Sequence, residues 1–118
     1  MSMELSCKVV DVVDSYLPNV NILNIDCGIA IIKMDIHKEL TLAKKGDLIN
    51  IGIYKSLPSY AAGKDFLAHG YVITKKKDEN HINIYISLWG YLIVIKTNEN
   101  RLNEYLNTMD KVYIKLWK

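Results

Sequence analysis

Arginine is nearly absent from this chain of 118 residues, since Arg101 is the single arginine among 15 basic residues. Base-specific DNA recognition relies on bidentate guanidinium contacts to base edges, so this scarcity argues against it. The 15 basic and 13 acidic residues leave a formal net charge of only +2. A dedicated nucleic-acid binder usually carries a stronger and more localised positive excess, so direct nucleic-acid contact is expected to be weak or absent.

Long apolar runs are also missing. No segment approaches the roughly 18 apolar residues that span a bilayer. The first eight residues lack the basic region and the apolar stretch of a secretory signal. We therefore expect a cytoplasmic protein without a membrane partner. Half of its residues are hydrophobic, which is enough to fill one core, so residues 1–118 are expected to form a single domain.

Catalytic and metal-binding signatures are absent from the sequence. No Cys-x-x-Cys or His-x-x-x-His spacing occurs, and the three histidines are dispersed, at His37, His69 and His81. Among the acidic residues, Asp11 and Asp14 flank the first expected turn, and Asp78 and Glu79 lie in another. Acid–base catalysis instead needs carboxylates held in a pocket with separated pKa values. We predict no catalytic site, no metal and no cofactor.

Alternation of apolar and polar residues recurs along the chain, whereas long helical periodicity is nearly absent. The alternation predicts eight short strands, at residues 3–13, 20–26, 29–36, 48–56, 66–76, 80–88, 91–96 and 111–117. Residues 97–108 are expected to form a loop with one helical turn at 102–106, and residues 57–65 a mobile loop. Gly52 interrupts one strand face, which suggests a bulge or the close approach of another backbone.

Eight short strands with irregular connections predict an all-β fold. A closed or nearly closed antiparallel barrel of the oligonucleotide/oligosaccharide-binding (OB) type is the first choice. A small β-sandwich is the competing architecture.

The two cysteines are expected to face each other. If the first hairpin turns near Leu17, paired positions sum to about 34, which places Cys7 opposite Cys27 and within the Cα separation of a disulfide, about 4.4 to 6.8 Å. An intracellular location favours a reduced pair that packs as two small hydrophobes. A disulfide is the alternative, because intracellular proteins of thermophiles carry such bonds.

The densest basic run is Lys75-Lys76-Lys77, which Asp78 and Glu79 follow at once. Contact with nucleic-acid phosphates is one interpretation. The neighbouring acids favour the other, a solvated hairpin tip that discourages edge aggregation.

Aromatic residues gather on one parity of two strands. Strand 80–88 has an apolar face suited to a core, and its other face carries Asn83, Tyr85, Ser87 and Trp89. The last strand likewise sets apart Lys111, Tyr113, Lys115 and Trp117. This pattern predicts an outer band of Tyr and Trp framed by lysines, with Tyr91 in line with Trp89. The rings fit three roles: half-buried strand formers, anchors for a partner protein, or platforms for single-stranded bases.

Five short segments occur in the order of a known family. They are residues 33–36 (KMDI), 46–47 (GD), 69–72 (HGYV), 86–93 (ISLWGYLI) and 110–116 (DKVYIKL). Together, over about residues 8 to 116, they resemble the G subunit of archaeal DNA-directed RNA polymerase, the counterpart of the eighth common subunit of eukaryotic nuclear RNA polymerases. The eukaryotic members usually have a glycine pair where this chain has Trp89-Gly90, and their loops are longer, which suggests a compact archaeal form here.

The resemblance implies an OB-type barrel docked on the periphery of the largest polymerase subunit, where it contributes to assembly or stability. Nucleotidyl transfer and its magnesium would belong to the large subunits, and no homo-oligomer is expected. Tyr85, Trp89 and Tyr91 are the expected partner contacts. Gly90 is expected to permit a close backbone approach or a sharp bend.

A free-standing OB-fold protein that binds single-stranded nucleic acid through the aromatic–lysine face is the alternative function. Binding of that kind weakens steeply with added salt, because counterions are released. Docking through buried aromatic side chains should weaken much less.

Overall fold

The structure is a computed structural model that describes residues 2–41, 43–62 and 64–118. In chain order its elements are β1 (Ser2–Asp14), β2 (Val20–Asp26), β3 (Ala30–His37), the 3₁₀ helix η1 (Lys38–Leu40), β4 (Leu48–Tyr54), β5 (Phe66–Lys77), β6 (Ile82–Leu88), β7 (Tyr91–Thr97), α1 (Asn100–Tyr105) and β8 (Lys111–Trp117). All eight predicted strands are present. The predicted helical turn is found slightly earlier than expected, as α1, and β4 ends at Tyr54 rather than at residue 56.

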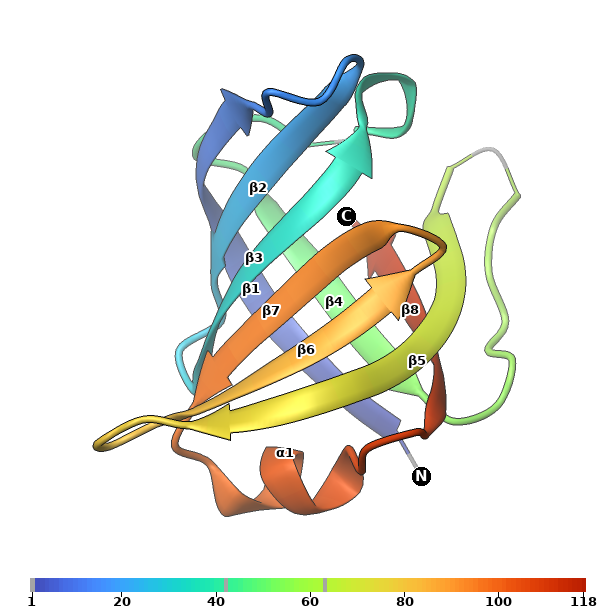
Figure 1. Cartoon of the computed structure of the whole chain (residues 1–118). Coiled ribbons are helices and arrows are strands. Elements are labelled where there is room, and N and C mark those ends of the chain that lie inside the picture. The colour runs from blue at the N-terminus through green and yellow to red at the C-terminus, as the bar shows by residue number, and fades with distance from the viewer. Residues whose placement is uncertain (1, 42, 63) are drawn as a thin grey trace.

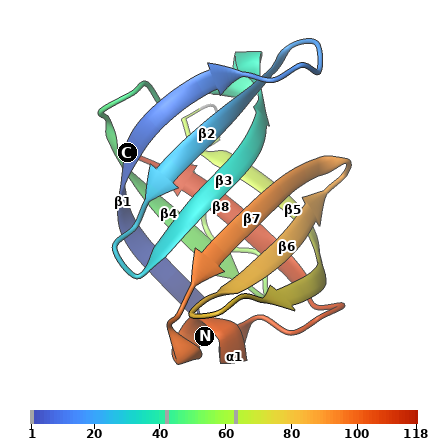
Figure 2. The same ribbon diagram turned by 60° about the vertical axis from the view of Figure 1, so that its left-hand side comes forward.

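The eight strands close into an antiparallel barrel. Around the barrel they follow the order β1-β2-β3-β7-β6-β5-β8-β4, so each strand has two hydrogen-bonded neighbours (Figures 1 and 2). This arrangement confirms the predicted all-β closed barrel, and the sandwich alternative was wrong. Closure depends on pairs between strands distant in sequence, namely β3 with β7, β4 with β1 and β8, and β5 with β8.

Period-two alternation fills the barrel. Along β3, for example, Ala30, Ile32, Met34 and Ile36 are buried, whereas Ile31 and Lys33 between them are exposed. Isoleucine supplies most of the largest fully buried side chains, and its branched Cβ suits a pleated wall. Burial of each such side chain contributes roughly 1.5 to 3 kcal/mol. One continuous core therefore holds all eight strands.

Helix α1 closes one end of the barrel (Figure 1). Leu102, Tyr105 and the following Leu106 are buried against the core, and the Tyr105 hydroxyl donates to the carbonyl oxygen of Ile53 at 3.2 Å. Lys75 fixes the outer side of this helix, because its Nζ donates to the backbone oxygen of Asn103 at 2.8 Å and to its Oδ1 at 2.9 Å.

The position of Lys75 corrects the prediction of a solvated lysine tip for one of its three lysines. The pairing of β5 with β6 shifts register between Val72 and Thr74, which marks a β-bulge. Beyond the bulge Lys75 lies opposite Ile84, a fully buried residue, so its side chain lies at the end of the barrel that α1 covers. Only Lys76 and Lys77 of the run are exposed.

Cys7 and Cys27 form a disulfide that joins β1 to the end of β2. The expected pairing is confirmed, since Lys8 lies opposite Asp26 and Val9 opposite Ile25, both with position sums of 34. The preference for a reduced pair is corrected. The two Cα atoms are 4.1 Å apart, which is slightly below the expected separation of about 4.4 to 6.8 Å.

Among the described residues, no helix is long and apolar enough to cross a membrane.

Candidate docking surface

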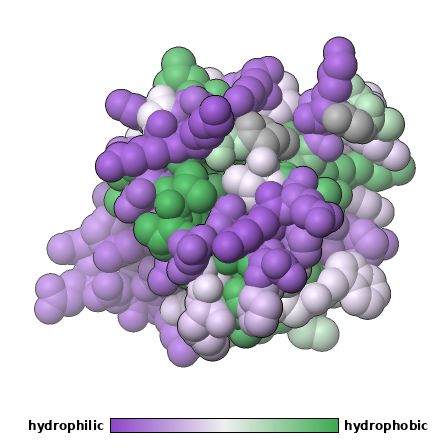
Figure 3. Space-filling model, turned by 90° about the horizontal axis from the view of Figure 1, so that it is seen from above, coloured by the Kyte–Doolittle hydropathy of each residue, from purple (hydrophilic) through white to green (hydrophobic). Residues whose placement is uncertain are grey.

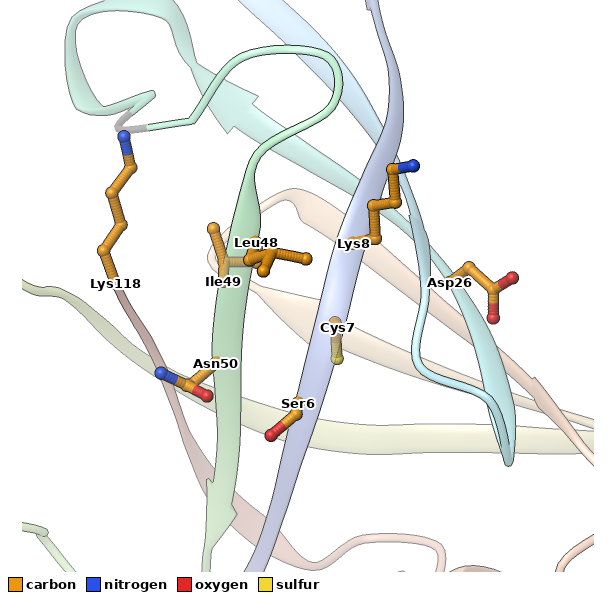
Figure 4. A pocket seen from close by; sticks show the side chains of 8 residues that line it. All are labelled: Ser6, Cys7, Lys8, Asp26, Leu48, Ile49, Asn50 and Lys118. Carbon is orange, nitrogen blue, oxygen red and sulfur yellow. The ribbon is translucent and has the colours of Figure 1, made fainter.

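A shallow pocket of about 390 Å³ lies over β1 and β4, and Figure 4 shows the eight residues that line it. Three of its groups have roles in the fold: Cys7 is in the disulfide, Lys118 pairs with Asp47 at 3.1 Å, and Asp26 accepts the N–H of Gly28.

The histidines are held apart by the fold. The His37 Nδ1 atom accepts the N–H of Glu39, and the His69 Nε2 atom accepts from Trp89, while His81 lies near the β5–β6 connection. Within the described ranges, no three His, Cys, Asp or Glu side chains come together as a metal site.

The predicted aromatic band lies on the wall formed by β6, β5 and β8. In the barrel β5 separates the two strands on which the band was predicted. The outward residues of β5 complete this surface. Tyr71 lies opposite both Ser87 of β6 and Lys111 of β8, and His69 lies opposite Tyr113. The sequence predicted this strand but not its place in the band, although the alternation Leu67, His69, Tyr71, Ile73 already marks its outer parity.

Trp89 is the most exposed ring of this wall, with 79% of its surface accessible. Leu88 and Tyr91 form the last pair between β6 and β7, so Trp89 and Gly90 make a two-residue turn with φ of +56° and +95°. Positive φ at both positions is the requirement of a tight hairpin, which normally selects Asn and Gly. The Trp89 Nε1–H donates to His69 Nε2 at 3.3 Å, and the two rings meet edge to face, with centroids 5.6 Å apart.

Gly90 serves the sharp bend rather than a close approach. A Cβ atom built at Gly90 would meet nothing within 4 Å, so only the left-handed backbone favours glycine there. The close approach is found at Gly70 of β5, where a Cβ atom would overlap the Ser87 carbonyl oxygen.

The other two predicted contacts lie differently. Tyr85 is half-buried on the outer wall, with the Lys76 ammonium 5.4 Å from its ring centroid. Tyr91 is half-buried and packs against the core, so the structure does not place it in line with Trp89. Of the predicted contacts, Trp89 and Tyr85 share the outer wall.

Lysines frame the rings as predicted. Lys111 lies 5.4 Å from the Tyr113 ring centroid, and Lys115 lies 4.5 Å from that of Trp117. Lys115 also donates to the Ser59 carbonyl at 2.9 Å and lies 3.8 Å from Asp65, which ties the β4–β5 connection to β8. The predicted mobility of residues 57–65 stays a prediction, and one of them, Gly63, lies outside the described residues.

Comparison with known proteins gives one consistent result. Residues 2–118 match the family of the G subunit of DNA-directed RNA polymerase. The DNA-directed RNA polymerase subunit Rpo8 of Saccharolobus solfataricus is 33% identical over 116 residues, which cover 92% of this chain and 87% of that protein. Rpo8 of Sulfolobus acidocaldarius is 33% identical over 90 residues, covering 75% of this chain and 74% of that protein.

A solved structure of the cytoplasmic molybdate-binding protein ModG overlaps 98% of this chain and 89% of its own, with a TM-score of 0.39 and 13% identity. A likeness at that level carries no argument about ligand or function.

Proposed function

The chain belongs to the family of the G subunit of DNA-directed RNA polymerase, and from this premise we propose that it is a peripheral, non-catalytic subunit that docks on the largest subunit of the enzyme. In this role it contributes to the assembly and stability of the polymerase in the cytoplasm. Nucleotidyl transfer takes place elsewhere in the complex. The pocket over β1 and β4 fits this division of labour, because Asp26 and Lys118 in its lining already serve the fold.

The observation that carries the proposal is the exposed Trp89 at the β6–β7 turn. The two-residue turn leaves 79% of the Trp89 surface accessible. Exposure of so large an apolar ring to solvent is unfavourable in a free monomer. Trp and Tyr are the preferred anchors of protein interfaces, because a large rigid ring buries much surface at a small entropic cost. We assign Trp89 and Tyr85 as contacts, Gly90 as the residue that sets the turn, and Tyr91 as its support from the core side.

The test is incorporation of variant chains into polymerase reconstituted from its separate subunits. Trp89→Ala together with Tyr85→Ala should reduce the fraction of enzyme that carries this chain by more than about thirtyfold, since hot-spot aromatics contribute about 2 kcal/mol or more each. Ile31→Ala is the matched control, because Ile31 is also exposed and apolar but lies on β3. Thermal unfolding of each isolated chain checks that the barrel is intact.

Cross-linking identifies the partner. A photoreactive residue at position 89 should join this chain to the largest subunit, whereas one at position 31 should not. Normal incorporation of the folded double variant, or cross-links from position 89 to another subunit alone, would exclude the proposed interface.

A further inference from the structure

We propose that the outer face of β5, bounded by Trp89 on one flank and Met109 on the other, receives a segment of the partner protein in which apolar side chains alternate with carboxylates. This inference rests on the proposed docking function and names the chemistry of the segment that docks. We call the surface formed by His69, Tyr71, Ile73, Trp89 and Met109 the β5 face.

The register places these five side chains in one continuous strip. Trp89 follows Ser87, the partner of Tyr71 on β6, by two residues, and its indole reaches His69. On the other flank Met109 precedes Lys111, the partner of Tyr71 on β8, by two residues. The Met109 N–H donates to the Val72 carbonyl at 2.7 Å, which sets Met109 beside Ile73. The strip therefore runs diagonally across β5 from Trp89 to Met109.

Its apolar side chains are open to solvent. Trp89 and Met109 are 79% and 77% accessible, and Tyr71 and Ile73 are each about half accessible, at 48% and 47%. These four are the exposed large hydrophobic residues of the described chain after residue 65. An apolar group of this kind gathered in one place marks an interaction site.

Two of these residues occupy backbone positions that disfavour them. Within the described ranges, three residues other than glycine have positive φ, namely Asn19, Trp89 and Met109. Asparagine tolerates this conformation, whereas a large apolar side chain in it costs stability. Both bulky examples flank β5 and both are exposed. Residues with such unfavourable backbone conformations concentrate at functional sites. Here both of them hold an apolar side chain in solvent beside β5.

The strands that form the β5 face carry charge of one sign, and Asp110, the carboxylate next to Met109, is already paired with Lys55 at 3.3 Å. β5, β6 and β8 contain no aspartate or glutamate. Lys76 and Lys111 border the face and form no ion pair with any described carboxylate. Two unpaired lysines beside an apolar surface are complementary in charge to carboxylates on the docking segment.

A protein segment fits this face better than a nucleic acid. Lys76, Lys111 and Lys115 lie over the rings of Tyr85, Tyr113 and Trp117, where stacking bases would have to lie. Ile73 and Met109 offer no flat surface for a base, but their side chains suit apolar side chains of a protein.

The first test separates docking from folding. Trp89→Asn and Met109→Gly each place a residue that favours positive φ at its position, so each variant should unfold at the same or a higher temperature. Equal amounts of wild-type and variant chain compete during polymerase reconstitution, and mass spectrometry gives the ratio incorporated. We expect Trp89→Asn to be under-represented about thirtyfold and Met109→Gly about fivefold, as for a hot spot and a flanking contact. Ile31→Asn, the control on β3, should be incorporated equally.

The second test addresses charge. Lys76→Glu with Lys111→Glu should lower incorporation and reverse its salt dependence. Lys8→Glu with Lys33→Glu makes the same change in net charge with exposed lysines on β1 and β3, and should leave incorporation unchanged. A photoreactive residue at position 109 in the assembled enzyme should cross-link to a peptide that carries apolar residues next to Asp or Glu.

The outcomes distinguish this inference from the proposed function. Exclusion of the Trp89 variants with normal incorporation of the Met109 and lysine variants would overturn the β5 face and leave the docking role in place. Normal incorporation of all of them would overturn both. Cross-links from position 109 to nucleic acid, or to a segment without carboxylates, would overturn the chemistry assigned to the partner.

Discussion

The wall formed by β2, β3 and β7 carries Asp26, Asp35, Lys33 and Lys96, whereas the wall formed by β6, β5 and β8 carries rings and lysines without any carboxylate. Both walls turn aliphatic side chains inward, chiefly isoleucine, leucine and valine. Similar interiors thus support different exteriors. The period-two pattern fixes the fold through one parity and leaves the other parity open to a different use on each side of the barrel.

The two sides of the barrel also differ in the contacts that hold their strands in place. The disulfide between Cys7 and Cys27 cross-links β1 and β2. On the other side, β5 approaches β6 so closely at Gly70 that no side chain fits, and Lys75 fixes α1 against the barrel end. Each side of the barrel therefore has structural constraints of its own, which can be removed one at a time.

Seen from the end opposite α1, hydrophobic groups reach the surface as separate patches between polar side chains (Figure 3).

Gly70→Ala should have the largest effect. The new methyl group would overlap the Ser87 carbonyl oxygen. This oxygen belongs to the backbone of β6, which cannot move aside as a side chain can. We expect a loss of roughly 4 kcal/mol in the free energy of unfolding, at the upper end for single substitutions. Gly52→Ala is the matched comparison. Its methyl group would meet the Tyr54 ring, which can rotate, so roughly 1 kcal/mol is expected. Urea unfolding midpoints measure both, and equal losses would contradict the backbone clash.

Loss of the disulfide should come next. Cys7→Ser with Cys27→Ser opens a loop of about 20 residues, which should cost about 3 kcal/mol. Amide exchange should accelerate first in β1 and β2, and later in β6. Addition of a reductant should lower the unfolding midpoint of the wild type alone. An unchanged wild-type midpoint would show that the bond does not contribute in solution.

Much of this fold follows from the sequence because its causes are local. Alternation gave the strand positions, and a turn near Leu17 gave the pairing that brings Cys7 to Cys27. The neighbours β5 and β8 could not be obtained in this way, since their pairing depends on closure of the whole barrel. The bulge near Ile73 was equally hidden, because one extra residue reverses the parity of everything after it.

The candidate site follows the same division. Trp89 and Tyr85 could be assigned to an outer face from their own strand. Met109 stands in an irregular connection, where no periodicity indicates which way a side chain points. The register of β5 with β8 and the hydrogen bond to Val72 place it beside β5. Tyr91 was misplaced because a two-residue turn returns it to the core side.

A smaller effect is expected at Lys75. Lys75→Met keeps most of the side-chain length but removes both hydrogen bonds to Asn103, so we expect a loss of about 1 to 2 kcal/mol. Lys76→Met, at the neighbouring exposed position, should change the unfolding midpoint little. Amide exchange of residues 100–106 should accelerate only in the Lys75 variant. Equal exchange in both variants would exclude Lys75 as the residue that fixes α1.

The smallest effects should arise from two aspartates in turns, Asp110 just before β8 and Asp47 just before β4. Asp110 accepts the N–H of Asn107 at 3.0 Å and lies 3.3 Å from Lys55 Nζ. Asp47 accepts the N–H of Lys44 at 2.9 Å and pairs with Lys118. In each case the backbone hydrogen bond, followed by the lysine, lowers the carboxyl pKa. A folded pKa below the unfolded value contributes stability that is present above about pH 4 and is lost as the pH falls through the folded pKa.

Asp110 adjoins Met109, so its protonation should be felt on the β5 face, whereas that of Asp47 should not. The methyl resonance of Met109 should shift with the Asp110 carboxyl titration, at a pH below that of an unfolded aspartate. It should stop responding in Asp110→Asn and be unchanged in Asp47→Asn. If the methyl resonance kept its titration in Asp110→Asn, the Asp110 carboxylate would be excluded as the group that Met109 senses. The left-handed backbone at Met109 would then be held by backbone hydrogen bonds, from the Met109 N–H to Val72 and from the Val72 N–H to Asp110.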